Sequence, residues 1–85
     1  ISVRGRVQGV GFRYSAARAA RSLGVRGWGR NMPDSTVELF CEGEPSAVDR
    51  FISWLAQGPP GSAVRRVEKR PAAVQGTYRS FSIEY

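Results

Sequence analysis

The sequence predicts an α+β fold in which two helices cover one face of a β-sheet, and three observations support this prediction. The chain has 85 residues, enough for one domain with a single modest core. Two segments repeat apolar residues at the spacing of a helix with one buried face. The segments around them alternate apolar and polar residues, which is typical of half-exposed strands.

The first strand and the first helix are separated by a glycine-rich loop. Residues 1–7 alternate apolar and basic side chains, as a strand with one exposed face does. Residues 8–11 contain two glycines and continue neither element. From Phe12 apolar side chains recur at positions 12, 16, 19, 20 and 23, so we expect a helix that ends at Gly24.

Two strands and a tight turn follow. We expect strands over 25–31 and 36–42, joined by a turn at 32–35. The second strand carries apolar side chains on one face and carboxylates on the other: Val37, Leu39 and Cys41 against Glu38 and Glu42. We therefore expect the apolar face to lie in the core.

The remaining segment predicts a second helix and two further strands. Pro45 begins a helical pattern that ends before the Gly-Pro-Pro sequence at 58–60. Residues 64–71 form a basic strand in this interpretation, and residues 81–85 a short final one. The order, β-α-β-β-α-β plus a short extra C-terminal strand, predicts a ferredoxin-like two-layer α/β sandwich with an antiparallel sheet, formed by residues 1–85 as a single domain.

Composition excludes several classes of chemistry. The chain has no histidine, which removes Ser-His and Cys-His nucleophile pairs and the commonest transition-metal ligand, so we expect no metal and no cofactor. The single cysteine, Cys41, excludes an internal disulfide, and we expect it to be a buried small hydrophobe rather than a nucleophile. No apolar run approaches the roughly 20 residues of a membrane span. We expect a cytoplasmic protein that does not associate with membranes.

The charge of the chain and one loop both point to phosphate. Residues 1–30 carry seven arginines and no acidic residue, whereas residues 31–85 carry six basic and seven acidic residues. Such a field attracts phosphate on a small molecule or on nucleic acid. The glycines of the loop at 8–11 let backbone N–H groups point inward, and the following helix start adds unpaired N–H donors. Arg13 can bring its guanidinium to the same phosphate.

Two motifs resemble the signatures of the acylphosphatase family. The first is Gly5-Arg6-Val7-Gln8-Gly9-Val10-Gly11-Phe12-Arg13, and the second, after a helix of the right length, is Gly27-Trp28-Gly29-Arg30-Asn31. The resemblance covers nearly the whole chain. It implies an enzyme that hydrolyses the carboxyl-phosphate bond of acyl phosphates and releases inorganic phosphate. The absence of acidic residues from the first 30 positions argues against a magnesium site beside the loop, so we expect activity without a metal, and we expect a monomer.

The resemblance also implies roles for individual residues. Asn31 would position the attacking water, and the terminal carboxylate of Tyr85 would approach Arg13 and hold its guanidinium in place. Since no histidine or carboxylate is evident nearby, a phosphate oxygen of the substrate is expected to take the proton. The phosphate would be held by Arg13 and by the backbone of a loop that consists of Gln8, Gly9, Val10, Gly11, Phe12 and Arg13.

Two positions depart from the family's pattern. Gly29 stands where the family typically has a small apolar or β-branched residue, and Ser35 stands where it usually has glycine. If the turn needs a left-handed backbone at Ser35, the serine costs about 1 kcal/mol. Both positions flank Asn31, so they bear on the placement of that residue.

Two other functions are open at this point. An RNA-binding module of this fold would stack bases on aromatic residues of its first and third strands, but here the first strand has none and the third only Phe40. A non-catalytic acylphosphatase-like phosphate-binding domain, of the kind found in larger carbamoyl-transfer or hydrogenase-maturation proteins, often has proline after the loop arginine, where this chain has Tyr14. Both differences favour the enzyme over these alternatives. We therefore do not expect nucleic acid to be a partner.

Overall fold

Seven elements follow one another in the predicted order β-α-β-β-α-β with a further strand at the end. The structure is a computed structural model that describes residues 1–9, 11–70 and 75–84. Its elements are β1 (Ser2–Arg6), α1 (Phe12–Leu23), β2 (Arg26–Asn31), β3 (Val37–Glu42), α2 (Pro45–Gln57), β4 (Ala63–Glu68) and β5 (Phe81–Glu84). None of the helices in these ranges is long and apolar enough to cross a membrane.

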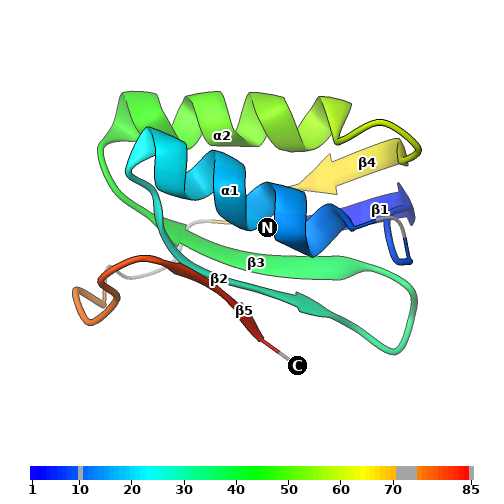
Figure 1. The fold of residues 1–85 in the computed structure, drawn as a ribbon, viewed down its shortest axis with the longest axis horizontal. Coiled ribbons are helices and arrows are strands. Elements are labelled where there is room, and N and C mark those ends of the chain that lie inside the picture. The colour runs from blue at the N-terminus through cyan, green and yellow to red at the C-terminus, as the bar shows by residue number, and fades with distance from the viewer. Residues whose placement is uncertain (10, 71–74, 85) are drawn as a thin grey trace.

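The sheet has the strand order β4-β1-β3-β2-β5, and both helices lie on the same side of it (Figure 1). The pairs β1–β4, β1–β3 and β2–β3 are antiparallel, as predicted. The extra strand β5 instead runs parallel to β2, with Gly27 opposite Phe81 and Gly29 opposite Ile83. The sheet is therefore mixed, and β5 carries the C-terminal segment past the start of α1.

The core between the two layers holds the start of α1 in place. Phe12, the first residue of α1, is 1% exposed, and its ring lies 5.9 Å from that of Trp54 on α2. Phe51 of α2 meets Phe81 of β5 edge to face, with ring centroids 5.5 Å apart. Burial of each such aromatic side chain contributes about 1.5–3 kcal/mol to folding. The loop before Phe12 is thus attached directly to the core.

The bounds of β1, β2 and β3 differ from the sequence prediction by one residue at one or both ends, and the largest difference is at β4. The basic strand expected over 64–71 is β4, which begins at Ala63 and ends at Glu68. Glu68 pairs with Ser2, the first residue of β1, so the ladder between the two strands ends there. Lys69 and Arg70 therefore lie beyond the strand, and residue 71 lies outside the described residues.

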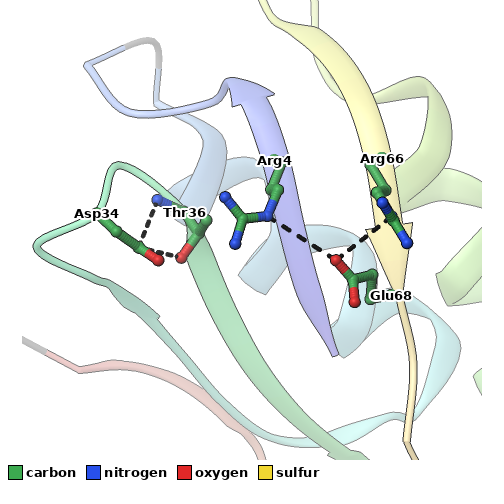
Figure 2. A network of polar contacts seen from close by, with 5 residues as sticks. All are labelled: Arg4, Asp34, Thr36, Arg66 and Glu68. Atoms are coloured by element: carbon green, nitrogen blue, oxygen red, sulfur yellow. Dashed lines mark hydrogen bonds and ion pairs between the residues drawn. The ribbon is translucent and has the colours of Figure 1, made fainter.

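The face of the sheet opposite the helices carries charged and aromatic side chains. Glu68 lies 3.8 Å from Arg4 and 3.3 Å from Arg66 (Figure 2). Exposed ion pairs of this kind contribute little to stability. Glu42, predicted for the exposed face, is on that face but only 4% exposed, because its carboxylate accepts hydrogen bonds from the backbone N–H of Gly76. The segment before β5 therefore covers one corner of this face.

Candidate active site

One pocket brings together the glycine-rich loop, the start of α1 and the end of β2. Its volume is about 220 Å³, and Val7, Gly9, Gly11, Phe12, Arg13, Tyr14, Asn31 and Ile83 line it. Five residues proposed from the sequence for the site are in this set, namely Gly9, Gly11, Phe12, Arg13 and Asn31. Gln8 is not among the lining residues, and Val10 lies outside the described residues. Tyr14, which is 64% exposed, and Ile83 also line the pocket, although the sequence analysis proposed neither as a site residue.

The loop turns because its glycines adopt a left-handed backbone. Gly9 has φ of 77° and Gly11 of 73°, values at which a side chain is strained. Gly11 is also the residue that caps α1, and within the described residues no side chain caps this helix start. The first turn of α1 contains no acidic residue. The N–H groups of the first turn, with the positive end of the helix dipole, therefore face the pocket side without a competing carboxylate.

Arg13 is anchored by the last strand. Its Nη1 atom donates a 2.8 Å hydrogen bond to the backbone carbonyl of Glu84 on β5. A guanidinium has five N–H donors in a fixed plane, so this bond orients the group while leaving further donors for other partners. The predicted contact between Arg13 and the carboxylate of Tyr85 involves a residue outside the described part of the chain. The anchoring carbonyl of Glu84 was not foreseen from the sequence, because a main-chain acceptor has no residue-type signal.

Asn31 ends β2 and is one of the residues that line the pocket. Its partner in the ladder is Val37 of β3. The Oδ1 atom is buried and has no hydrogen-bond partner among the described residues. An unsatisfied buried acceptor costs about 1–3 kcal/mol, so such atoms are rare and call for an explanation. Asn31 is also one of the residues that line the pocket, so this unpaired acceptor belongs to a residue of the site.

Gln8 ties the loop to the turn that follows Asn31. Its Nε2 atom donates to the carbonyl oxygen of Met32 at 2.9 Å and to that of Thr36 at 3.0 Å. These two residues are 24 and 28 positions away in the sequence. Sequence reasoning assigned Gln8 to the loop through its backbone and missed this role of its side chain. The only available signal was a long amide side chain next to a glycine turn.

The two departures from the family's pattern have different structural consequences. Ser35 has φ of 72°, so serine does occupy a left-handed position. The adjacent Asp34 accepts hydrogen bonds from the N–H and Oγ1 of Thr36, and these bonds lower the pKa of Asp34 (Figure 2). At Gly29 an added Cβ atom meets Phe81 at 3.5 Å and Leu39 at 3.6 Å, which is ordinary contact. Glycine is thus not required at position 29, and its presence leaves the pairing of Asn31 with Val37 intact.

Cys41 is packed against the core beside Val37 and Leu39, as the alternation of β3 predicts. Burial raises the pKa of this thiol from 9.0 to about 12. The thiolate that a nucleophile needs is therefore not formed near neutral pH. In the ranges 1–9, 11–70 and 75–84, no three His, Cys, Asp or Glu side chains are grouped so as to hold a metal ion.

Comparison with known proteins identifies the family. The acylphosphatase family model matches residues 1–83. An acylphosphatase of Thermococcus kodakarensis is 52% identical over an alignment of 79 residues, and the match covers 89% of this chain and 87% of that protein. The chain belongs to the acylphosphatase family. The crystal structure of acylphosphatase from Bacillus subtilis superimposes with a TM-score of 0.92 at 36% identity, covering 99% of this chain and 93% of the other.

The acylphosphatase fold also occurs inside a much larger protein. The crystal structure of T. kodakarensis HypF matches this chain with a TM-score of 0.87 and 35% identity. The match covers all of this chain but only 11% of HypF. The relatives that share most of their length with this chain are acylphosphatases, so acylphosphatase activity, with an acyl phosphate as substrate and phosphate as product, is the function of the chain. The RNA-binding alternative is set aside on the same grounds.

Proposed function

We propose that the acylphosphatase reaction proceeds by direct attack of a water molecule, held by Asn31, on the phosphorus of an acyl phosphate held by Arg13 and the loop of residues 8–13. The observation that carries this proposal is one pocket lined by the loop glycines, by Arg13 and by Asn31, whose amide oxygen has no hydrogen-bond partner among the described residues. Binding groups and a water-positioning group on one small cavity are what an in-line displacement requires.

The loop and Arg13 supply the phosphate-binding half of the site. The turn at Gly9 and Gly11 directs backbone N–H groups toward the pocket side, and α1 adds its uncapped first-turn donors. Charge in the transition state of phosphoryl transfer is spread over the equatorial oxygens, which fixed donors stabilise without reorganisation. Arg13 adds a full positive charge whose orientation is supported by its bond to Glu84.

Asn31 supplies the other half. Its Oδ1 accepts a hydrogen bond from one O–H of the water, and this bond directs a lone pair of that water toward the phosphorus. An amide does not take up the proton, because it is neither acidic nor basic near neutral pH. A phosphate oxygen of the substrate accepts the proton as the new O–P bond forms. The bond between phosphorus and the acyl oxygen breaks, and the carboxylate leaves with its electron pair.

The reaction so written needs neither a metal nor a cofactor, because the leaving carboxylate is already a good leaving group and the positive charge comes from protein groups. We further propose that residues 1–85 act as one domain and as a monomer, since one chain is enough to bring the loop, Arg13 and Asn31 to one pocket. A cytoplasmic location is proposed because the single cysteine forms no internal disulfide.

The second candidate function is phosphate binding without turnover, which the similarity to a segment of HypF favours. In that case the loop and Arg13 would still bind phosphate, but Asn31 would contribute nothing to a reaction. The two candidates therefore differ in the water-positioning half of the site and agree on the other half.

Hydrolysis of benzoyl phosphate in excess EDTA tests the proposal. We expect the unmodified protein to turn over, and Arg13→Ala to lose both turnover and competitive inhibition by inorganic phosphate. Asn31→Ala should lower kcat by at least about 100-fold while phosphate still inhibits, because removal of one group that acts in the transition state has effects of this size. Arg18→Ala, on the exposed side of the same helix and outside the pocket, is the control and should change little.

Each other result has a defined meaning. Phosphate binding without turnover in the unmodified protein would establish the binding-domain alternative. Turnover that disappears in EDTA and returns with a divalent cation would refute the metal-independent mechanism. Full activity of Asn31→Ala would remove that residue from the mechanism.

A further inference from the structure

The side chain of Gln8 spans the two halves of the site. It starts in the glycine-rich loop, is not among the residues that line the pocket, and ends on the turn between β2 and β3. Both N–H donors of its amide are needed for its two acceptors, the carbonyl oxygens of Met32 and Thr36. A side chain used in this way has no donor left for a phosphate in the pocket.

The two carbonyls that Gln8 binds are the ends of one turn. The N–H of Met32 donates to the carbonyl of Thr36 at 2.8 Å, and the N–H of Ser35 donates to the carbonyl of Met32 at 3.1 Å. Each of these two carbonyl oxygens has a second lone pair, and this lone pair accepts a hydrogen bond from the side-chain amide of Gln8. The amide of Gln8 therefore clamps the turn from the protein side, whereas the bonds between Asp34 and Thr36 close it from the solvent side (Figure 2).

This turn needs such support because of Ser35. A serine with φ of 72° is in a conformation that L-residues avoid and that glycine adopts readily. The turn is therefore less favourable in this sequence than with glycine, and side-chain hydrogen bonds hold it closed.

Asn31 immediately precedes the clamped turn. Its Oδ1 makes no hydrogen bond to the described residues, so within that part of the chain the amide oxygen is oriented by the backbone at the end of β2 rather than by a partner of its own. A shift of Met32 moves the peptide next to Asn31. Because Gln8 fixes Met32 relative to the loop, it fixes the distance between the phosphate-binding half and the water-positioning half.

We propose that Gln8 is a positioning residue: its side-chain amide does not bind the phosphate but locks the turn of residues 32–36, and thereby sets Asn31 opposite the loop. This inference rests on the proposed function, in which Asn31 holds the attacking water. Small displacements of a positioned group lower rates by up to about 100-fold. The role predicts an effect on kcat that is separate from phosphate binding.

The test compares Gln8→Ala and Gln8→Glu with the unmodified protein. Glutamate has the same length but places only acceptor oxygens against two carbonyls. We expect both variants to lower kcat for benzoyl phosphate by about 10- to 100-fold, with less than about a threefold change in the inhibition constant of inorganic phosphate. Gln57→Ala, which removes an exposed glutamine outside the pocket, is the matched control and should leave both quantities unchanged.

Addition of Ser35→Gly to Gln8→Ala distinguishes positioning from direct contact. Glycine makes the turn conformation favourable without the clamp, so we expect the double variant to recover at least about fivefold of the lost kcat. Absence of recovery would overturn transmission through the turn. A loss of phosphate inhibition as large as that of Arg13→Ala would instead make Gln8 a phosphate ligand and also overturn the proposal.

A readout that does not need turnover separates this inference from the proposed function. The side-chain NH2 resonances of Asn31 report its orientation in an NMR spectrum. They should shift in Gln8→Ala and return toward their original positions in the double variant. If the unmodified protein lacks turnover but these shifts appear, the reaction mechanism fails while the clamp stands. If turnover is normal in Gln8→Ala and the resonances do not move, the clamp fails alone.

Discussion

One turn lines the pocket and a second follows Asn31 of the pocket, and a left-handed backbone is achieved in them by different means. The loop before α1 uses glycine for its left-handed positions, at Gly9 and Gly11. The turn after β2 uses Ser35, with φ of 72°, which is within 1° of the value of 73° at Gly11. Glycine adopts this conformation without strain, whereas serine does so at a cost of about 1–2 kcal/mol.

Because of this difference, the two halves of the site depend on different residues for the shape of their backbone. The loop acquires its shape from its own residues and from Phe12, which is buried beneath it. The turn is closed by side chains, namely Asp34 from within it and Gln8 from the loop. The backbone of the phosphate-binding loop therefore takes its shape from its own sequence, whereas the turn of the water-positioning half depends on a side chain of the neighbouring loop. Disturbing either turn tests this asymmetry.

The largest effect is expected for Gly11→Ala. A Cβ atom at Gly11 meets no atom within 4 Å, so the substitution acts on the backbone alone. We expect a loss of about 1–2 kcal/mol in the free energy of unfolding and at least a tenfold weaker inhibition by inorganic phosphate, because the loop N–H groups turn away from the pocket. Chemical denaturation and phosphate inhibition measure the two quantities.

Gly61→Ala is the matched control for that substitution. Gly61 also has a left-handed φ, 89°, and a Cβ there meets no atom within 4 Å, but it lies in the turn after α2, outside the pocket. It should lower the free energy of unfolding by a similar amount and leave phosphate inhibition unchanged. Equal effects of both variants on phosphate inhibition would mean that lost stability, rather than loop geometry, is being measured.

A smaller effect of opposite sign is expected for Ser35→Gly. Removal of the strain should raise the free energy of unfolding by about 1 kcal/mol, which corresponds to about 4–8 °C in Tm for a chain of this size. Turnover should stay within about twofold, since Gln8 already holds the turn in the unmodified protein. Thermal denaturation and benzoyl phosphate hydrolysis check the two expectations.

Ser53→Gly controls for the general effect of glycine. Ser53 is exposed in the middle of α2, where the backbone is helical, so the same substitution should lower the free energy of unfolding by about 0.5 kcal/mol. If both serine variants lose stability, the left-handed conformation at Ser35 carries no strain, and the contrast between the two turns disappears.

The sequence predicted the parts of this protein that depend on local pattern. Periodicity and residue type predict the element order and the buried faces of α1 and β3. Residue type also pointed to Ser35 as a position where the turn could need a left-handed backbone. The parallel pairing of β5 with β2 did not, because the direction of a short edge strand is set by the path of the chain before it. Periodicity also placed Glu42 on the exposed face but did not show that another segment covers it.

In the candidate site, too, the sequence predicted some features and others became visible only in the folded structure. Family resemblance pointed to residues that the structure brings to one pocket, Arg13 and Asn31 among them. It did not reveal the bonds from Arg13 to Glu84 or from Gln8 to Met32, because both acceptors are main-chain carbonyls that every residue possesses. Which carbonyl a side chain reaches depends on tertiary packing, so these contacts needed the folded structure.

The smallest effect is expected for Gly29→Ala. This substitution tests whether strand β2 itself affects the position of Asn31. The added methyl group makes ordinary contact with Phe81 and Leu39. Glycine within a strand costs about 0.5–1 kcal/mol relative to alanine, so the free energy of unfolding should rise by about that amount. Turnover and phosphate inhibition should not change, because the strand is already paired on both sides at this residue. A fall in kcat at increased stability would show that the end of β2 has to move during the reaction, and the turn would then be a hinge for Asn31 rather than a fixed support.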